Sequence, residues 1–160
     1  MASLPSEPRG GDSNRWRSLR SLAMSIVNHV GLCVTDLACA RAFYEQVLGF
    51  VHTYDLPVPD GPTSTLLRIP APVSLVAVYL ERDGFVLELL HFAREGNAPQ
   101  RERSFTEPGL THLSFTVDDV AATCALVTEH GGEVLADTDL GVAVMVRDPD
   151  GQLLELLAPR

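Results

Sequence analysis

Hydrophobic and polar positions alternate strictly at the start of the main body of the chain. Residues 27–35 place apolar side chains on one face and the smaller or polar ones on the other, which predicts a half-buried strand. A stripe of apolar residues with helical spacing then extends to about residue 48. Asp36 stands where it can cap this helix, and Gly49 stands where it can end it.

Three further strands are expected after this helix. A proline-rich stretch at 57–72 interrupts them and predicts a loop with a short turn of helix near Thr65–Arg68. Asp83-Gly84 predicts a tight hairpin turn. The strands are expected at 50–56, 73–80 and 85–92.

The second part of the chain repeats this order with shorter connections. Asp118 or Asp119 is expected to cap a helix that extends to about His130 and ends at Gly131-Gly132. The turn sequence 148–151 joins the last two strands. The strands of this part are expected at 110–117, 133–136, 142–147 and 152–158.

An eight-residue segment, Asp-Gly followed by an apolar run, occurs once in each part of the chain. Each copy holds one carboxylate, Glu88 or Glu155, between leucines. Each part also begins with one histidine, His29 or His112, at the start of an apolar alternation. The repeat predicts a single α+β domain made of two βαβββ modules, at 26–92 and 110–160. We expect a flexible tail at 1–25 and a linker or flap at 93–109.

The repeated acids and histidines form a candidate metal site. Alternation along a strand directs each glutamate away from its leucine neighbours, and a carboxylate within a sheet is costly without a cation or a hydrogen-bond donor. Two imidazoles and two carboxylates are a complete ligand set for Zn, Ni, Co, Fe or Mn, and the set does not discriminate among these metals. The predicted ligands are His29, Glu88, His112 and Glu155.

Composition narrows the choice of partners. The chain has 160 residues, a hydrophobic content of 46% and a formal net charge of -9, which disfavours binding to nucleic acid. No apolar run reaches the roughly 20 residues that span a bilayer, and the opening segment does not resemble a secretory signal. The spacing of the chain's 3 cysteines shows no disulfide framework. We therefore expect a cytoplasmic protein without a membrane partner. All 12 basic residues are Arg, which excludes a Schiff-base lysine.

The paired modules resemble the vicinal oxygen chelate superfamily, which includes glyoxalase I, the bleomycin resistance proteins and the extradiol dioxygenases. The resemblance covers the chain after Ser25. It implies a curved mixed sheet around a metal-containing cleft, with ligands on the first and last strands of each module, and it selects the same four residues. The motifs that carry it are the segments 28–37, 43–50 and 148–156.

The ligand pattern is closest to glyoxalase I and similar to methylmalonyl-CoA epimerase. We therefore expect a metal-dependent lyase or isomerase that moves a proton next to a carbonyl through a metal-stabilised enolate. Glu155 and Glu88 are the predicted catalytic residues as well as ligands. The substrate is expected to be a small carbonyl compound, and no organic cofactor is expected.

Two other functions remain open at this stage. An extradiol-type Fe(II) dioxygenase would use His29, His112 and Glu155 as its ligands. Glu88 disfavours it, because a fourth protein ligand would occupy a coordination position on the iron that oxygen or catechol needs. A drug-binding protein of the bleomycin-resistance kind would use the same cleft without a metal. We expect a homodimer, and the four ligands could come from one chain or from two.

Overall fold

A computed structural model describes residues 25–93 and 104–160, and these residues form two modules with the same order of elements. The tail predicted at 1–25 lies almost wholly outside the described residues, and so does much of the predicted linker or flap. The first module contains β1 (Val30–Val34), α2 (Leu37–Gln46), β2 (Val51–Leu56), α3 (Asp60–Leu67), β3 (Leu75–Arg82) and β4 (Phe85–Phe92). The second contains β5 (Leu113–Thr116), α4 (Val120–Glu129), β6 (Glu133–Val134), the 3-10 helix η2 (Ala136–Thr138), β7 (Ala143–Arg147) and β8 (Leu153–Leu157).

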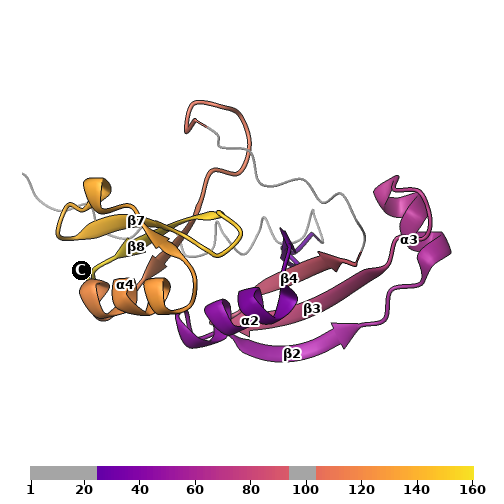
Figure 1. Ribbon diagram of the computed structural model, residues 1–160, viewed down its shortest axis with the longest axis horizontal. Coiled ribbons are helices and arrows are strands. Elements are labelled where there is room, and N and C mark those ends of the chain that lie inside the picture. Colours follow the sequence, from indigo (N-terminus) through magenta and orange to yellow (C-terminus); the bar gives the residue numbers. More distant parts are fainter. Residues whose placement is uncertain (1–24, 94–103) are drawn as a thin grey trace, which may run out of the picture.

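Each module forms a four-stranded mixed sheet, and the two sheets are separate and open. The strand orders are β1-β4-β3-β2 and β5-β8-β7-β6. In each sheet the first strand pairs in parallel with the last, and the remaining pairs are antiparallel. Figure 1 shows the second module, in orange to yellow, beside the first module in indigo to magenta. The predicted α+β fold with two βαβββ modules is confirmed.

The helices begin where the sequence places their caps. Asp36 accepts a hydrogen bond from the backbone N–H of Cys39 at 3.0 Å, and Asp119 accepts one from Ala122 at 2.9 Å. Each cap satisfies one of the N–H groups that the first turn of a helix leaves without a partner. Of the two predicted caps for the second helix, the structure selects Asp119.

The turn at Asp83-Gly84 is a two-residue hairpin. Both residues have positive φ, 53° and 79°, the combination that matches the right-handed twist of the flanking strands. Such a turn pairs Arg82 with Phe85 and determines the register of the whole hairpin.

Some of the predicted bounds were wrong. The proline-rich segment forms α3, an eight-residue helix that begins at Asp60, earlier than the short turn expected near Thr65–Arg68. The Asp60 carboxylate accepts hydrogen bonds from the backbone N–H groups of Val73 and Ser74, which ties the helix start to the approach of β3. The first strand of each module and β6 are shorter than alternation predicts, because pairing partners are found for only part of each segment.

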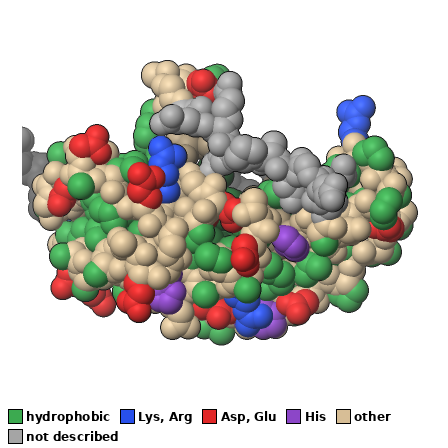
Figure 2. Space-filling view, in the orientation of Figure 1, with side chains coloured by type: hydrophobic (Ala, Val, Ile, Leu, Met, Phe, Trp, Pro, Cys, Tyr) green, Lys and Arg blue, Asp and Glu red, His purple; other side chains and the backbone are tan. Residues whose placement is uncertain are grey.

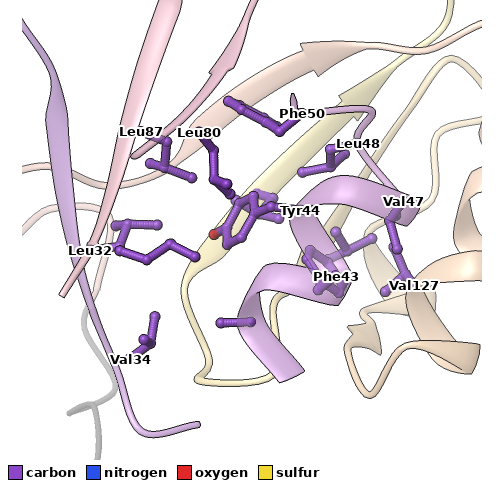
Figure 3. Packing of buried hydrophobic residues seen from close by; sticks show 14 of the residues in the cluster. Leu32, Val34, Phe43, Tyr44, Val47, Leu48, Phe50, Leu80, Leu87 and Val127 are labelled. Atoms are coloured by element: carbon purple, nitrogen blue, oxygen red, sulfur yellow. The ribbon is translucent and has the colours of Figure 1, made fainter. Parts of the chain in front are cut away.

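A single hydrophobic core joins the modules. Buried side chains of both sheets and both long helices belong to one cluster, in which Phe43, Leu87, Leu154 and Leu156 are fully buried. Figure 3 shows Phe43 of α2 and Val47, the residue after this helix, on the side that faces Val127 of α4. The modules therefore pack through their helices. We call the face of each sheet away from this core its open face, and in the first sheet Tyr79 and Glu88 on that face are nevertheless buried.

Hydrogen bonds to the side chains of Asp148 and Asp150 also connect the modules. The buried phenol of Tyr44 donates to Asp148 Oδ2 at 2.8 Å, and the Thr35 hydroxyl donates to Asp150 Oδ1 at 2.5 Å. Asp148 also accepts backbone N–H bonds from Asp150 and Gln152. The turn between β7 and β8 is thus held against the first module.

Candidate metal centre

The first half-site consists of His29, just before β1, and Glu88 in the middle of β4. Parallel pairing sets Gly31 beside Glu88, and alternation turns Glu88 away from its buried neighbours Leu87 and Leu89. His29 Nε2 lies 3.1 Å from Glu88 Oε2. The predicted histidine and glutamate of the first module therefore meet on the open face of its sheet.

The second half-site repeats this arrangement. His112 immediately precedes β5, and Glu155 lies in the middle of β8 between the buried Leu154 and Leu156. His112 Nε2 lies 3.7 Å from Glu155 Oε2. The duplicated sequence has produced a duplicated pair of ligand-type side chains.

The second ring nitrogen of each histidine is held by the preceding residue. His29 Nδ1 lies 2.6 Å from Asn28 Oδ1, and His112 Nδ1 lies 3.0 Å from Thr111 Oγ1. The amide oxygen of Asn28 can only accept, so His29 Nδ1 carries a proton and, in the neutral ring, Nε2 presents a lone pair to the carboxylate. Two facing acceptors need a cation between them, either a proton or a metal ion. This orientation through Nδ1 is common in metal-binding histidines.

The spacing of each pair fits two neighbouring ligands of one ion. A metal bonded to both atoms at about 2.1 Å keeps them roughly 3.0 Å apart in octahedral geometry and roughly 3.4 Å apart in tetrahedral geometry. The observed separations of 3.1 and 3.7 Å lie close to these values. Neutral imidazole and carboxylate are also the ligands that Zn, Ni, Co, Fe and Mn accept.

The two carboxylates have different surroundings. The Tyr79 hydroxyl donates to Glu88 Oε1 at 2.6 Å, so a partner lies at each Glu88 oxygen, and the side chain is 11% exposed. Ser114 donates to Glu155 Oε2 at 2.7 Å, the oxygen that also faces His112, and this side chain is 30% exposed. Glu88 is thus enclosed, whereas one oxygen of Glu155 has no hydrogen-bond partner among the described residues.

Tyr79 is suited to act as a donor at this site. Burial, the hydrogen bond to Glu88 and the negative charge of that carboxylate raise the pKa of Tyr79 above its ordinary value. Its ring stacks on Tyr54, with centroids 4.5 Å apart, and makes a T-shaped contact with the His29 ring at 5.5 Å. The phenol therefore stays protonated, and its ring is held by two neighbouring rings.

The structure does not bring the two half-sites together within one chain. Among residues 25–93 and 104–160, no group of three or more His, Cys, Asp and Glu side chains lies close enough to share an ion. Each half-site offers two ligands on the open face of its own sheet. Figure 2 shows acidic side chains over the visible face, and histidines among them.

Sequence reasoning missed the hydroxyl donors Tyr79 and Ser114. The signal for Tyr79 was present, because a two-residue turn at Asp83-Gly84 pairs the strands so that Tyr79 stands opposite Glu88. Ser114 reaches Glu155 through the parallel pairing of β5 with β8, which joins residues 41 positions apart. No local pattern predicts that contact.

The fold agrees with the comparison to known families. The family described as Glyoxalase/Bleomycin resistance protein/Dioxygenase superfamily matches residues 26–156, which is most of the chain. The chain belongs to this superfamily. In the described part of this superfamily member, no helix has both the length and the apolar character required to cross a membrane.

Several curated proteins are similar to this superfamily member. YaeR of Escherichia coli K12 is 30% identical, over 84% of this chain and 97% of its own length. A lactoylglutathione lyase of Pseudomonas putida is 28% identical, over 86% and 87% of the two chains. CFP32 of Mycobacterium tuberculosis is 25% identical over 98% of this chain, and the chain spans only 55% of that protein.

Solved structures show the same fold at low identity. A glyoxalase family protein from Bacillus cereus has a TM-score of 0.68 and 17% identity, and the match covers 86% of this chain and 97% of that one. The fosfomycin resistance protein FosX of Listeria monocytogenes, solved with Mn(II) and sulfate, has a TM-score of 0.58 and 16% identity, with coverage of 86% and 95%. At these identities the likeness concerns the fold alone.

Proposed function

We propose that this chain is a metal-dependent lyase or isomerase that moves a proton next to a carbonyl group of a small substrate. The observation that carries the proposal is the duplicated pairing of histidine with glutamate on the open faces of the two sheets. The proposed ligands of the divalent ion are His29, Glu88, His112 and Glu155. A curated relative, the lactoylglutathione lyase, supports it through its named activity.

An ion in this centre would act as a Lewis acid that polarises the substrate carbonyl and stabilises the negative charge left by deprotonation. The residues of the chain divide the remaining work. Both oxygens of Glu88 have partners, so this side chain acts as a fixed ligand. Glu155 has one oxygen without a hydrogen-bond partner in the described part of the chain, so it is the carboxylate that takes up and returns the proton.

We further propose that two copies complete the centre. β1 and β5 are edge strands of their sheets, and the histidines stand at the start of these edges. An edge strand offers unpaired backbone groups to a second chain. In a twofold dimer the first half-site of one copy would face the second half-site of the other, which yields two equivalent four-ligand centres.

We also propose a cytoplasmic location. Cys33, Cys39 and Cys124 are free thiols, which supports a reducing compartment.

Metal analysis of protein purified without chelators tests the proposed centre directly. One divalent ion per chain is expected. In Glu155→Gln, turnover of the adduct of a 2-oxoaldehyde with a thiol should fall at least about 100-fold, because the amide cannot accept the proton. Far-ultraviolet circular dichroism should show an unchanged fold. Protein without metal, or Glu155→Gln with full activity, would contradict the proposal.

A mixing experiment tests where the ligands come from. One variant carries His29→Ala and Glu88→Gln, and the other carries His112→Ala and Glu155→Gln. If centres form between copies, each variant alone lacks a four-ligand centre, whereas each mixed dimer regains one. Random exchange then restores about a quarter of the wild-type high-affinity metal sites. No restoration, in a mixture shown by mass spectrometry to contain mixed dimers, would refute centres that form between copies.

Oxygen consumption separates the proposal from the dioxygenase alternative. The Fe(II)-loaded protein should not consume oxygen when a catechol is added, because four protein ligands leave too few positions for catechol and oxygen. Oxygen uptake with ring cleavage would favour the dioxygenase.

A further inference from the structure

The donors that hold the two carboxylates come from different strands in the two modules. Tyr79 of β3 stands opposite Glu88, and the β1 residue beside Glu88 is Gly31, which has no side chain. In the second module this is reversed, because Ser114 of β5 stands beside Glu155 and the β7 residue opposite is Met145. The repeat therefore conserves the acid and the histidine but exchanges the position of the hydroxyl.

The exchange changes which oxygen is held. Tyr79 reaches Oε1 of Glu88, so Oε2 remains directed at His29. Ser114 reaches Oε2 of Glu155, the oxygen that faces His112, and the other oxygen is left to move. When a donor holds the carboxylate oxygen that points away from the histidine, the other oxygen stays directed at the histidine. When the donor holds the oxygen that faces the histidine, the carboxylate can rotate about that oxygen.

The Tyr79 ring is itself supported. It stacks on the Tyr54 ring, nearly parallel at 12°, and makes a T-shaped contact with the His29 ring. The residue is 5% exposed, and Glu88 is 8% exposed. A buried phenol stacked on a second ring loses little freedom when it donates, so its hydroxyl is already in place for the carboxylate.

We propose that Tyr79 is a positioning residue, whose hydroxyl holds Oε1 of Glu88 so that Oε2 stays directed at the proposed metal ion. This inference rests on the proposed metal centre and deepens it. The two halves of the centre then bind metal unequally, with the more rigid half in the first module.

The test compares Mn(II) affinity among variants, with free Mn(II) followed by its electron paramagnetic resonance signal. Tyr79→Phe keeps the ring and removes only the donor, and we expect its Mn(II) affinity to fall roughly 10- to 100-fold. Tyr54→Phe is the matched control, because its hydroxyl makes no hydrogen bond to Glu88. Its Mn(II) affinity should equal that of the wild type.

A second variant tests whether the position of the hydroxyl matters. In Tyr79→Phe combined with Gly31→Ser, the hydroxyl is moved to the strand that supplies it in the second module. A Cβ added at Gly31 would lie 3.5 Å from Glu88 Oε2 and 3.3 Å from Leu90 Cδ1, so a serine fits after a small movement of the leucine. Its hydroxyl would reach Oε2 and leave Oε1 without a donor, so the double variant should bind Mn(II) as weakly as Tyr79→Phe.

The outcomes are distinct. A wild-type protein that binds no Mn(II), Zn(II), Co(II) or Ni(II) overturns the proposed function and this inference together. Wild-type Mn(II) affinity retained in Tyr79→Phe overturns this inference alone. Full recovery of Mn(II) affinity in the double variant also overturns the positioning role, because a donor at either oxygen would then suffice. A fall in the melting temperature of metal-free Tyr79→Phe that accompanies its loss of affinity overturns it as well, because the loss would then be structural. Weak binding in both variants at the wild-type melting temperature establishes it.

Discussion

Removal of the Tyr44 hydroxyl should weaken the connection between the modules. The side chain is fully buried, and its phenol donates to Asp148 Oδ2 at 2.8 Å. Figure 3 shows Tyr44 among the apolar side chains of the shared core. Tyr44→Phe leaves this packing intact but deprives a buried carboxylate oxygen of its donor. A hydrogen bond to a charged group contributes about 1.5–3 kcal/mol, so we expect a loss of about 2 kcal/mol in the free energy of unfolding at pH 7.

The cost of Tyr44→Phe should depend on pH. Burial raises the pKa of Asp148 above its ordinary value of 3.8, against the opposing effect of its hydrogen bonds. The folded state therefore holds this proton at a higher pH than the unfolded state does. The contribution of Asp148 to stability is greatest below the unfolded pKa and falls as pH rises through the folded pKa. Loss of the Tyr44 donor raises the folded pKa further, so the variant loses more at pH 7 than at pH 3.

Urea unfolding of the metal-free protein at the two pH values measures this difference. For a chain of this size, about 2 kcal/mol corresponds to a melting temperature roughly 4–8 °C lower. Tyr54→Phe serves as the control, because its side chain is 50% exposed and the same chemical change should cost less than about 0.5 kcal/mol. A cost below about 0.5 kcal/mol for Tyr44→Phe, or an equal cost at both pH values, would refute the reasoning.

Two further predictions concern the backbone and the helix caps. A Cβ at Gly132 would lie 2.5 Å from the carbonyl oxygen of Arg147, so Gly132→Ala should lower the free energy of unfolding by about 2 kcal/mol or more. The urea midpoint of Gly132→Ala measures this loss, and a stable Gly132→Ala protein would count against the predicted clash. Asp119→Ala removes the acceptor for the Ala122 N–H and should cost about 1 kcal/mol in the same assay, and no change would show that this cap contributes nothing.

Local features of the fold could be predicted well from the sequence. Asp36 and Asp119 cap the expected helices, and Asp83-Gly84 makes the expected turn, because each depends on dihedral preferences and hydrogen bonds within a few residues. The ends of strands were predicted less well. Alternation continues beyond residues that have a pairing partner, so β5 begins at Leu113 although the pattern begins at 110.

In the candidate site, too, the features that depend on local sequence were predicted. Alternation within the strands predicted that Glu88 and Glu155 would turn away from their leucine neighbours, because side chains point to opposite faces every second residue. The histidines at the two module starts were likewise identified from the repeat. Each predicted histidine lies beside the predicted glutamate of its module.

By itself, then, the amino-acid sequence determined the duplicated modules, their element order and the residues that each module can offer to a metal. Only the tertiary structure decided which groups surround those residues. Ser114 meets Glu155 through a parallel strand pair, and Tyr44 meets Asp148 through packing between modules. These contacts join distant parts of the chain, and they depend on how buried surfaces fit together and not on any local pattern. The same packing through the helices leaves the two half-sites on separate open faces in the described residues.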